Sequence, residues 1–543
     1  MFSPSIHSLV AAFRHAVTRG SRRVLPWVPL FGLAASAPAA GPVTATRGQV
    51  VFQSNFEGAA ALRGWAGRAT LAEGYQSAQA AALEAKPGQP ASLSLRLPVE
   101  TMRGCTVRGS ALVKADQVSA KPNAWNGIKF MLAIETAETK LWPQAPLDTG
   151  TFGWKRASFV TRIPSNATVV TLVLGLEQVT GKVWFDDLKL TVTKPPVSPQ
   201  PQPLAGPVFK GHNLPRLRGT MVAPSARPED LRTLGNQWKA NLIRWQLIRT
   251  LRPDPPTPLE DYDAWLESQL KKLDALLPVC EEAGLWVLVD LHSPPGGRST
   301  QGGYFGTDSR LFTDRTCQDK FVANWRGIAA RYKNAKAVWG YDLANEPVEE
   351  DVAEDCLDWH DLAERAGQAI RQIDPQRAII CEAPPWGGPA SLAEFTPIAV
   401  SNVVYSVHMY EPMAFTHQGV FNPNGPQQIY PGIINGKQWD AAALEAVFQP
   451  VIDFQRNFNV HIYIGEFSAI RWAPDHSACR YLADLIGIME KHGWDWSYHA
   501  FREWSGWSVE HGEDRADTRP ALQPTDRQQL LQSWFSHNQK PGR

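Results

Sequence analysis

Two glutamates that each follow a strand-like run are the residues of this chain best suited to acid–base and nucleophilic chemistry. Glu346 lies in Leu343-Ala-Asn-Glu-Pro347 and Glu466 in Ile464-Gly-Glu-Phe467. Hydrolysis of a glycosidic bond with retention needs two carboxyl groups about 5–5.5 Å apart, one protonated to release the leaving oxygen and one ionised to attack the anomeric carbon. Taken alone, a carboxylate at a strand end can equally be a helix N-cap or an ion-pair partner.

Further polar side chains collect at the ends of other strand-like runs. They belong to the second, third, fourth and sixth runs of the C-terminal region and are Arg244, His292, Asn345, His408 and Tyr410. In a retaining mechanism one carboxyl group stays ionised while the other holds a proton, so their surroundings must differ. Arg244 and a tyrosine hydroxyl near Glu466 would favour the ionised form of that residue.

The elements that must position these residues are apolar strand-like runs that alternate with helical patterns. The runs span 218–223, 241–245, 285–291, 338–343, 378–381, 403–407, 461–464 and 494–498. Helical patterns lie at 259–283, 317–332, 356–373, 441–458 and 478–492. Such alternation predicts an α/β fold, a closed (β/α)8 TIM barrel over 208–540, with its active site at the carboxyl ends of the strands. An open doubly wound sheet is the rival, but no G-x-G-x-x-G follows the first strand.

Residues 41–193 show short β-type runs separated by turns. The runs span 50–53, 91–97, 110–114, 128–134, 168–174 and 182–185, a pattern that predicts an all-β antiparallel sandwich. Six prolines then fall between Pro195 and Pro207, so we expect a Pro-rich linker over 194–207. At 543 residues the chain exceeds one ordinary core, which agrees with two folded units.

Residues 1–40 have the pattern of an export signal. Arginines between Arg14 and Arg23 precede the apolar stretch Val24 to Ala35, and small residues follow it. We expect a signal peptide that directs the protein to the periplasm or the outside, by the Sec or the twin-arginine route. A permanent membrane anchor is the alternative, but the apolar run is shorter than the roughly 20 residues that span a bilayer.

Composition limits the classes of partner. The 54 basic and 53 acidic residues nearly balance, so no global field would gather nucleic acid or an anionic membrane. A neutral polymer is the more natural partner, and some of the 21 tryptophans could stack on its sugar rings while most fill cores. The six cysteines form no C-x-x-C pair, and their disulfide pairing stays open.

Motifs of other hydrolases are not found. The sequence has no H-E-x-x-H or comparable ligand cluster, so we expect neither a metal nor another cofactor. It also has no G-x-S-x-G elbow of a serine hydrolase.

Five motifs, in this order, resemble glycoside hydrolase family 5, the cellulase family. They are Asn241-Leu-Ile-Arg-Trp245, Val289-Asp-Leu-His292, Leu343-Ala-Asn-Glu-Pro347, Val407-His-Met-Tyr410 and Ile464-Gly-Glu-Phe467. The resemblance runs from about Gly219 to Trp507. It implies an O-glycosyl hydrolase (EC 3.2.1 class) that acts by double displacement, with Glu346 as acid/base and Glu466 as nucleophile.

The resemblance also implies roles for the supporting residues. Asn345 would contact the sugar 2-hydroxyl and Glu466, while Arg244 and Tyr410 would orient Glu466. His292 would line the subsite of the reacting ring together with His408.

A tryptophan after the eighth strand is expected to form a sugar platform. We assign this place to Trp504, with Trp496 and Trp507 as alternatives. Three further carboxylates, Glu382, Glu411 and Glu503, could bind sugar hydroxyls, but we interpret each as a structural or rim residue. The loop at 293–312 is long for a strand-to-helix connection, and we expect it to form one wall of the cleft.

The expected substrate is a β-linked polysaccharide or oligosaccharide, with a β-1,4-glucan first and mannan next. Alternatives are another β-glycanase or transglycosylase of the same family, and a non-catalytic glycan-binding protein. The segment Gly181 to Leu190 looks like the last strand of jelly-roll carbohydrate-binding modules. Trp65, Trp125 and Trp142 could stack on sugar there if exposed. We expect a monomer that binds no nucleic acid and makes no stable membrane insertion.

Overall fold

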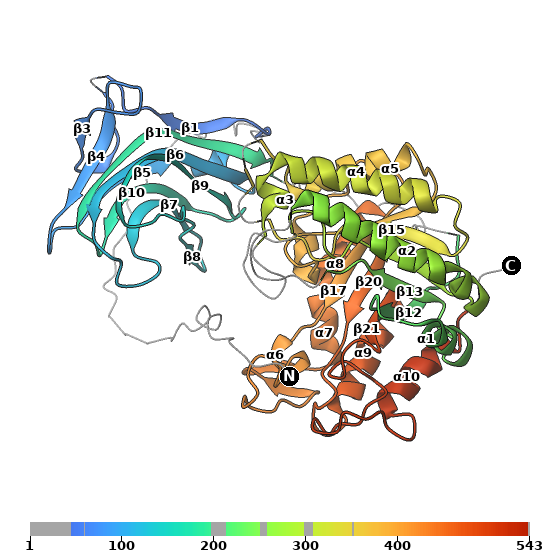
Figure 1. Cartoon of the computed structure of the whole chain (residues 1–543). Coiled ribbons are helices and arrows are strands. Elements are labelled where there is room, and N and C mark those ends of the chain that lie inside the picture. The colour runs from blue at the N-terminus through green and yellow to red at the C-terminus, as the bar shows by residue number, and fades with distance from the viewer. Residues whose placement is uncertain are drawn as a thin grey trace, which may run out of the picture. The chain divides into compact units, whose positions relative to one another are not determined.

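The computed structural model describes residues 45–58, 60–196, 213–249, 258–297, 308–349, 352–353 and 355–540 (Figure 1). The predicted signal peptide, most of the predicted linker and the middle of the loop at 293–312 lie outside these residues. Within them, no helix is both long and apolar enough to cross a bilayer.

The N-terminal region contains two antiparallel sheets. One has the order β3–β4–β11–β6–β9 with β1 beside β11, and the other has the order β2–β5–β10–β7–β8. The strands of the first are β1 Val50–Ser54, β3 Thr70–Ala72, β4 Ala80–Ala85, β6 Thr106–Val118, β9 Gly150–Arg162 and β11 Gly181–Lys194. Those of the second are β2 Ala66–Gly67, β5 Ala91–Leu97, β7 Gly127–Glu135, β8 Lys140–Leu141 and β10 Val169–Glu177.

Alternation along the strands builds the core between these sheets. In β7 the buried members of the core are Ile128, Phe130, Leu132 and Ile134, because successive side chains of a strand point to opposite faces. Lys129 and Met131 therefore lie on the outer face of the second sheet. The predicted all-β sandwich is confirmed, and β11 continues through Lys194, the first residue of the predicted linker.

The C-terminal region is a closed parallel barrel. Its strand order is β12–β13–β14–β15–β16–β17–β20–β21, and β12 pairs with β21 to close it. The strands are β12 Arg218–Val222, β13 Leu242–Gln246, β14 Trp286–Asp290, β15 Val338–Asp342, β16 Ala378–Glu382, β17 Val403–Met409, β20 His461–Phe467 and β21 Asp495–Phe501. This confirms the predicted (β/α)8 fold, with each strand within a few residues of its predicted place.

Helices lie outside the barrel (Figure 1). The longer ones are α2 Leu259–Ala283, α4 Arg315–Tyr332, α5 Trp359–Arg371, α7 Ala441–Val447, α8 Gln449–Phe458, α9 Ser477–His492 and α10 Asp526–Phe535. Shorter elements are α1 Pro228–Arg232, α3 Arg310–Thr313, η3 Pro389–Ala393, α6 Met413–Thr416 and the hairpin β18 Gly432–Ile434 with β19 Lys437–Trp439. The single helix predicted at 441–458 is wrong: α7 ends before Phe448, and α8 starts anew with Pro450 in its first turn, where proline's missing N–H costs no hydrogen bond.

The barrel interior changes from apolar to charged along its axis. Leu242, Leu288 and Ile380 belong to an apolar layer across the barrel. Since side chains on one face of a strand are two residues apart, the next inward residues of the same strands are Arg244, Asp290 and Glu382. The carboxyl ends of the strands therefore present buried charge to the barrel mouth.

Candidate active site

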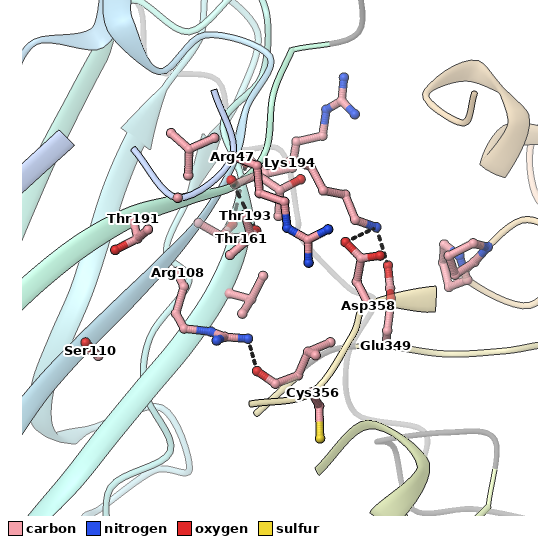
Figure 2. A pocket seen from close by; sticks show the side chains of 18 of the residues that line it. Arg47, Arg108, Ser110, Thr161, Thr191, Thr193, Lys194, Glu349, Cys356 and Asp358 are labelled. Atoms are coloured by element: carbon pink, nitrogen blue, oxygen red, sulfur yellow. Dashed lines mark hydrogen bonds and ion pairs between the residues drawn. The ribbon is translucent and has the colours of Figure 1, made fainter. Parts of the chain in front are cut away.

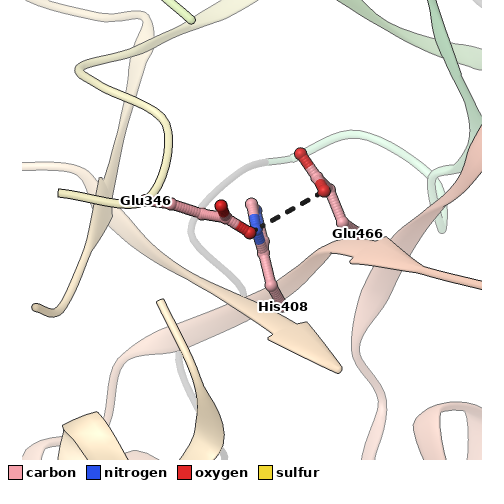
Figure 3. A group of neighbouring side chains, drawn as sticks. All are labelled: Glu346, His408 and Glu466. Carbon is pink, nitrogen blue, oxygen red and sulfur yellow. Dashed lines mark hydrogen bonds and ion pairs between the residues drawn. The ribbon is translucent and has the colours of Figure 1, made fainter. Parts of the chain in front are cut away.

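The two predicted catalytic glutamates lie on either side of one histidine. His408 Nδ1 is 2.9 Å from Glu346 Oε1 and 3.7 Å from Glu466 Oε2. One oxygen of each glutamate and one nitrogen of His408 all lie within 4.8 Å of one another. Figure 3 shows both carboxylates directed toward this ring. Glu466 lies within β20, and Glu346 follows β15 in the left-handed region with φ of 45°.

The surroundings of Glu466 favour its ionised form. Arg244 Nη1 donates to Oε1 at 2.7 Å, and the Tyr410 hydroxyl donates to Oε2 at 2.9 Å. Burial alone would raise the pKa of Glu466, but the charges of His408, His499 and Arg244 outweigh it and hold that pKa well below its usual range. The sequence-based expectation for Arg244 and a tyrosine hydroxyl agrees with these contacts.

Arg244 lies fully buried among four carboxylates. Besides Glu466, its guanidinium lies 2.8 Å from Asp342, 3.2 Å from Glu382 and 3.3 Å from Asp290. Its Nη2 also donates to the side-chain oxygen of Asn345 at 3.0 Å, which orients that amide. The Arg244 cation on β13 therefore contacts residues from the ends of four other strands.

Sequence reasoning missed the position of Glu382, which lies beneath the site. Its side chain is completely buried, so Glu382 is not a residue of the rim. Of the two interpretations given above, a structural role agrees with this position. Glu382 Oε2 accepts the backbone N–H of Glu346 at 2.8 Å, and Oε1 is 3.0 Å from His408 Nε2. The Glu382 carboxylate therefore contacts both the Glu346 backbone and the His408 ring and fixes them relative to each other. The two-residue step from inward Ile380 was the signal that could have found it.

Two aspartates of the same layer were also missed. Burial raises the pKa of Asp290 to about 7 and that of Asp342 well above its usual range, although Arg244 opposes both shifts. Asp290 Oδ2 is 2.9 Å from Nδ1 of His292, the predicted subsite residue, which is buried. Asp290 therefore fixes the orientation of that imidazole.

Strand β21 contributes a histidine that sequence reasoning did not single out. His499 Nδ1 is 2.5 Å from the Tyr410 hydroxyl oxygen and 3.4 Å from Glu466 Oε2. The other ring nitrogen, His499 Nε2, is 3.6 Å from Glu503 Oε1. Glu411, the third carboxylate considered above, is exposed next to Tyr410 in sequence. The nucleophile candidate thus has a histidine on each side, His408 and His499.

The three tryptophans considered as sugar platforms have different surroundings. Trp496 is buried against Phe535, with ring centroids 5.5 Å apart, and offers no face to a ligand. Trp507 is buried, and its ring is tilted by 38° against that of Tyr410, with the ring centroids 6.1 Å apart. Trp504 is 41% exposed and packs on Trp507 at 5.4 Å. Of the three, Trp504 therefore has the accessible ring. Trp507 contacts both Trp504 and Tyr410.

The group Glu346, His408 and Glu466 is compact enough to hold a metal ion. Both oxygens of Glu466 already accept hydrogen bonds, and the guanidinium of Arg244 places a positive charge next to it. A cation would meet that charge directly. The donor set therefore favours organic acid–base chemistry over metal binding.

A separate pocket is lined by residues of β6, β9 and β11, by Glu349, Cys356 and Asp358 with their neighbours Val348 and Val352, and by residues 384–386 (Figure 2). Its Lys194 ammonium is 2.5 Å from Glu349 Oε1 and 3.7 Å from Asp358 Oδ2. These charges pair with one another, and the pocket contains neither of the catalytic glutamate candidates. The candidate active site is the barrel mouth.

The chain is similar to several known proteins. Endoglucanase C of Acetivibrio thermocellus is 29% identical over 259 residues, which cover 43% of this chain and 73% of that protein. Cellodextrinase A of Ruminococcus flavefaciens is 25% identical over 245 residues, covering 44% and 70%. The crystal structure of endoglucanase Cel5A from Thermotoga maritima covers 58% of this chain and 96% of that one, with 24% identity and a TM-score of 0.44.

The match to a whole family is more extensive. Residues 206–505, which are more than half of the 543, match the family described as cellulase, glycosyl hydrolase family 5. That span contains every barrel strand and both glutamates. The chain therefore belongs to glycosyl hydrolase family 5, the cellulase family, and is a glycoside hydrolase.

Proposed function

We propose that this protein is a retaining β-glycanase that hydrolyses a β-1,4-glucan. The observation that carries the proposal is the pair Glu346 and Glu466, which have carboxylate oxygens within 4.8 Å of each other and unlike surroundings. Retaining enzymes need a separation near 5 Å, whereas inverting enzymes leave room for a water at roughly 6.5–9.5 Å. The short separation supports double displacement.

The contacts assign a role to each glutamate. Glu466, held ionised by Arg244 and Tyr410, attacks the anomeric carbon while Glu346 protonates the departing glycosidic oxygen. The bond from carbon to the leaving oxygen breaks as an ester bond to Glu466 forms. Glu346, now a carboxylate 2.9 Å from His408, then takes a proton from the water that attacks the same carbon and releases Glu466.

The remaining predicted residues complete the site. Asn345 is oriented by Arg244 and is proposed to contact the sugar 2-hydroxyl. His292 and His408 line the place of the reacting ring, and the exposed ring of Trp504 stacks on a neighbouring sugar. The names of the relatives, an endoglucanase and a cellodextrinase, support a glucan substrate. A polymeric substrate also agrees with the export and the monomeric state predicted from the sequence.

The test is hydrolysis of a glycan panel by the purified protein, followed by NMR of the first products. We expect release of sugars from carboxymethylcellulose and mixed-linkage β-glucan, with the β-anomer formed first and the α-anomer appearing only by mutarotation. Initial appearance of the α-anomer would refute retention. Faster cleavage of mannan than of glucan would move the substrate to mannan, and products longer than the substrate would indicate transglycosylation.

A second function is proposed for the sandwich, namely binding of the same polysaccharide. Trp125 and Trp142 are 63% and 57% exposed, whereas Trp65 packs on Phe52 and Phe56. A tryptophan ring presents a flat, amphipathic face, and such a face can stack on the flat face of a sugar ring. These two rings are the feature that supports a carbohydrate-binding module.

Polar contacts on the outer face of β7 connect the two segments that carry these tryptophans. Lys129 donates to the backbone oxygen of Trp125 and, at 2.9 Å, to the side chain of Gln144, two residues after Trp142. Glu177 pairs with the same ammonium at 2.8 Å. The loop of Trp125 and the segment of Trp142 are thereby fixed to one lysine.

Replacing both tryptophans tests this second function. Trp125→Ala with Trp142→Ala should weaken retention in affinity electrophoresis on β-glucan by about tenfold or more, because each stacked ring contributes on the order of 1 kcal/mol. Turnover of a soluble aryl cellobioside should stay unchanged. Trp184→Ala is the control, since that ring lies between Lys114 and Lys182 on the other sheet. Equal retention of the double variant and the control would contradict the proposal.

A further inference from the structure

We propose that His499 and Glu503 form a positioning pair that holds the hydroxyl of Tyr410 on Glu466. The proposal rests on the proposed function, because it concerns how the nucleophile is kept ready. It begins with the environment of one hydroxyl group. Tyr410 Oη lies 2.9 Å from Glu466 Oε2 and 2.5 Å from His499 Nδ1.

A tyrosine hydroxyl has one hydrogen to donate, so it cannot donate to both neighbours. If His499 Nδ1 is protonated, it donates to the Tyr410 oxygen, and the tyrosine hydrogen must point to Glu466. If Nδ1 is unprotonated, it accepts the tyrosine hydrogen and competes with Glu466 for it. Whether Nδ1 of His499 carries a proton therefore decides which way Tyr410 points. A neutral ring keeps its one proton on Nε2, because the Glu503 carboxylate faces that nitrogen.

Glu503 stabilises the doubly protonated form. Its Oε1 lies 3.6 Å from His499 Nε2, and its Oε2 accepts a hydrogen bond from Gln246 Nε2 at 2.7 Å. Gln246 ends β13, so a residue of the second strand keeps Glu503 beside the imidazole. With a carboxylate at Nε2 and a hydroxyl oxygen at Nδ1, the ring has acceptors for both of its N–H groups.

The groups that face His499 come from several elements. They are Glu466 on β20, Tyr410 and His417 after β17, Glu346 after β15 and Glu503 after β21. Burial lowers the pKa of His499, but the three glutamates outweigh it and raise that pKa above its usual value. Burial together with the charge of His499 lowers the pKa of His417 to about 4, so His417 stays neutral.

The sign of the pH effect follows from the raised pKa of His499. Below that pKa the imidazolium directs the Tyr410 hydrogen to Glu466. As pH rises through it, the proton is lost, Tyr410 can turn to His499, and Glu466 loses a hydrogen bond and a nearby positive charge. Removal of Glu503 should move this transition to lower pH, because the cation loses its partner.

The experiment is the pH profile of kcat/KM for Glu503→Gln with a dinitrophenyl β-cellobioside. This leaving group departs without protonation, so the titration of Glu346 does not shape the first step. We expect the alkaline limb to move toward lower pH by about one unit. At a fixed pH on that limb kcat/KM should then be about tenfold lower than in the unsubstituted protein, since one pKa unit corresponds to a factor of ten. At the plateau kcat/KM should stay within about threefold, and KM should change less than kcat.

Two further variants make the result decisive. Glu445→Gln is the matched control, because Glu445 pairs with His492 at 2.9 Å and is a residue of α7 and not of the barrel mouth. His499→Phe keeps an aromatic ring but removes the group that titrates, so its pH profile should lack the alkaline limb. In that background Glu503→Gln should cause no further change in the profile. Unchanged profiles for Glu503→Gln, or full additivity with His499→Phe, would overturn the positioning role. Either result would leave the roles of Glu346 and Glu466 standing, since those depend on their own variants.

Discussion

Replacement of Glu466 by alanine should reduce hydrolysis of polysaccharide by at least about 10⁴-fold, the scale on which loss of a catalytic nucleophile acts. No ester bond to the enzyme can form in this variant. The removed side chain leaves space beside Arg244 and Tyr410, whose donors point to where its oxygens were. Added azide should enter that space and attack the anomeric carbon, so that an activated β-glycoside yields the α-glycosyl azide.

Glu346→Ala should give the complementary result. Polysaccharide hydrolysis should again fall by a factor on the order of 10² to 10⁴, because the leaving oxygen departs without a proton. A dinitrophenyl glycoside should still form the ester with Glu466 and then stall, which gives a burst of dinitrophenol. Azide should now attack that ester from the opposite face and yield the β-glycosyl azide.

The configurations of the two azides are the decisive observation. The α-azide from Glu466→Ala and the β-azide from Glu346→Ala would assign each role independently of the size of the rate loss. The same azide from both variants would contradict the assignment. Full activity of either variant would remove the proposed mechanism. Circular dichroism of both variants checks that lost activity does not come from lost folding.

Replacement of Arg244 by methionine should produce the largest loss of stability in the barrel. The guanidinium is fully buried among Asp290, Asp342, Glu382 and Glu466. Removing one partner of a buried ion pair commonly costs about 3–5 kcal/mol, since the remaining charge has neither water nor counter-charge. We therefore expect the free energy of unfolding in urea to fall by at least this amount at pH 7, with catalytic activity lost as well.

The pH dependence of this loss distinguishes electrostatics from packing. Burial already raises the pKa values of Asp290 and Asp342 above their unfolded values, and the charge of Arg244 limits this rise. Without Arg244 these pKa values should rise further. Such groups favour folding when protonated and oppose it when ionised, so the deficit relative to the natural chain should shrink as pH falls toward 4–5. A deficit that is constant with pH would indicate a packing defect instead. Arg232→Met, which removes an exposed pair with Glu282, should change stability little and serves as control.

Much of the fold could be predicted because hydrophobic periodicity follows from burial. The eight barrel strands are nearly continuous apolar runs, as strands covered on both faces must be. The sandwich was less visible. Ala80–Ala85 forms β4 although alanine has low strand propensity, and Gly150–Arg162 forms β9 with a largely half-exposed pattern. Tertiary pairing with β11 and β6 decides both strands.

The site could be predicted to the extent that its residues terminate strands. The separation of Glu346 from Glu466 could not be derived from sequence, nor could the convergence of four carboxylates on Arg244. Asp290 and Asp342 stand in apolar runs, where an isolated acid gives no sign of its partner. His499 escaped notice because the motif expected after the eighth strand was a tryptophan, and the histidine reaches Glu466 through the pairing of β20 with β21.

The hydrogen bond from the Glu346 amide to Glu382 connects catalysis with the cooperativity of the domain. A loop after a strand usually opens locally at little cost, and its amides then exchange with solvent quickly. The Glu346 amide instead donates to a completely buried carboxylate that also binds Arg244 and His408. We therefore expect hydrogen exchange at this amide to be slower than at an ordinary surface loop. Local opening of the loop that carries Glu346, the proposed acid/base residue, would then be rare, and the proposed catalytic geometry would persist in the folded domain.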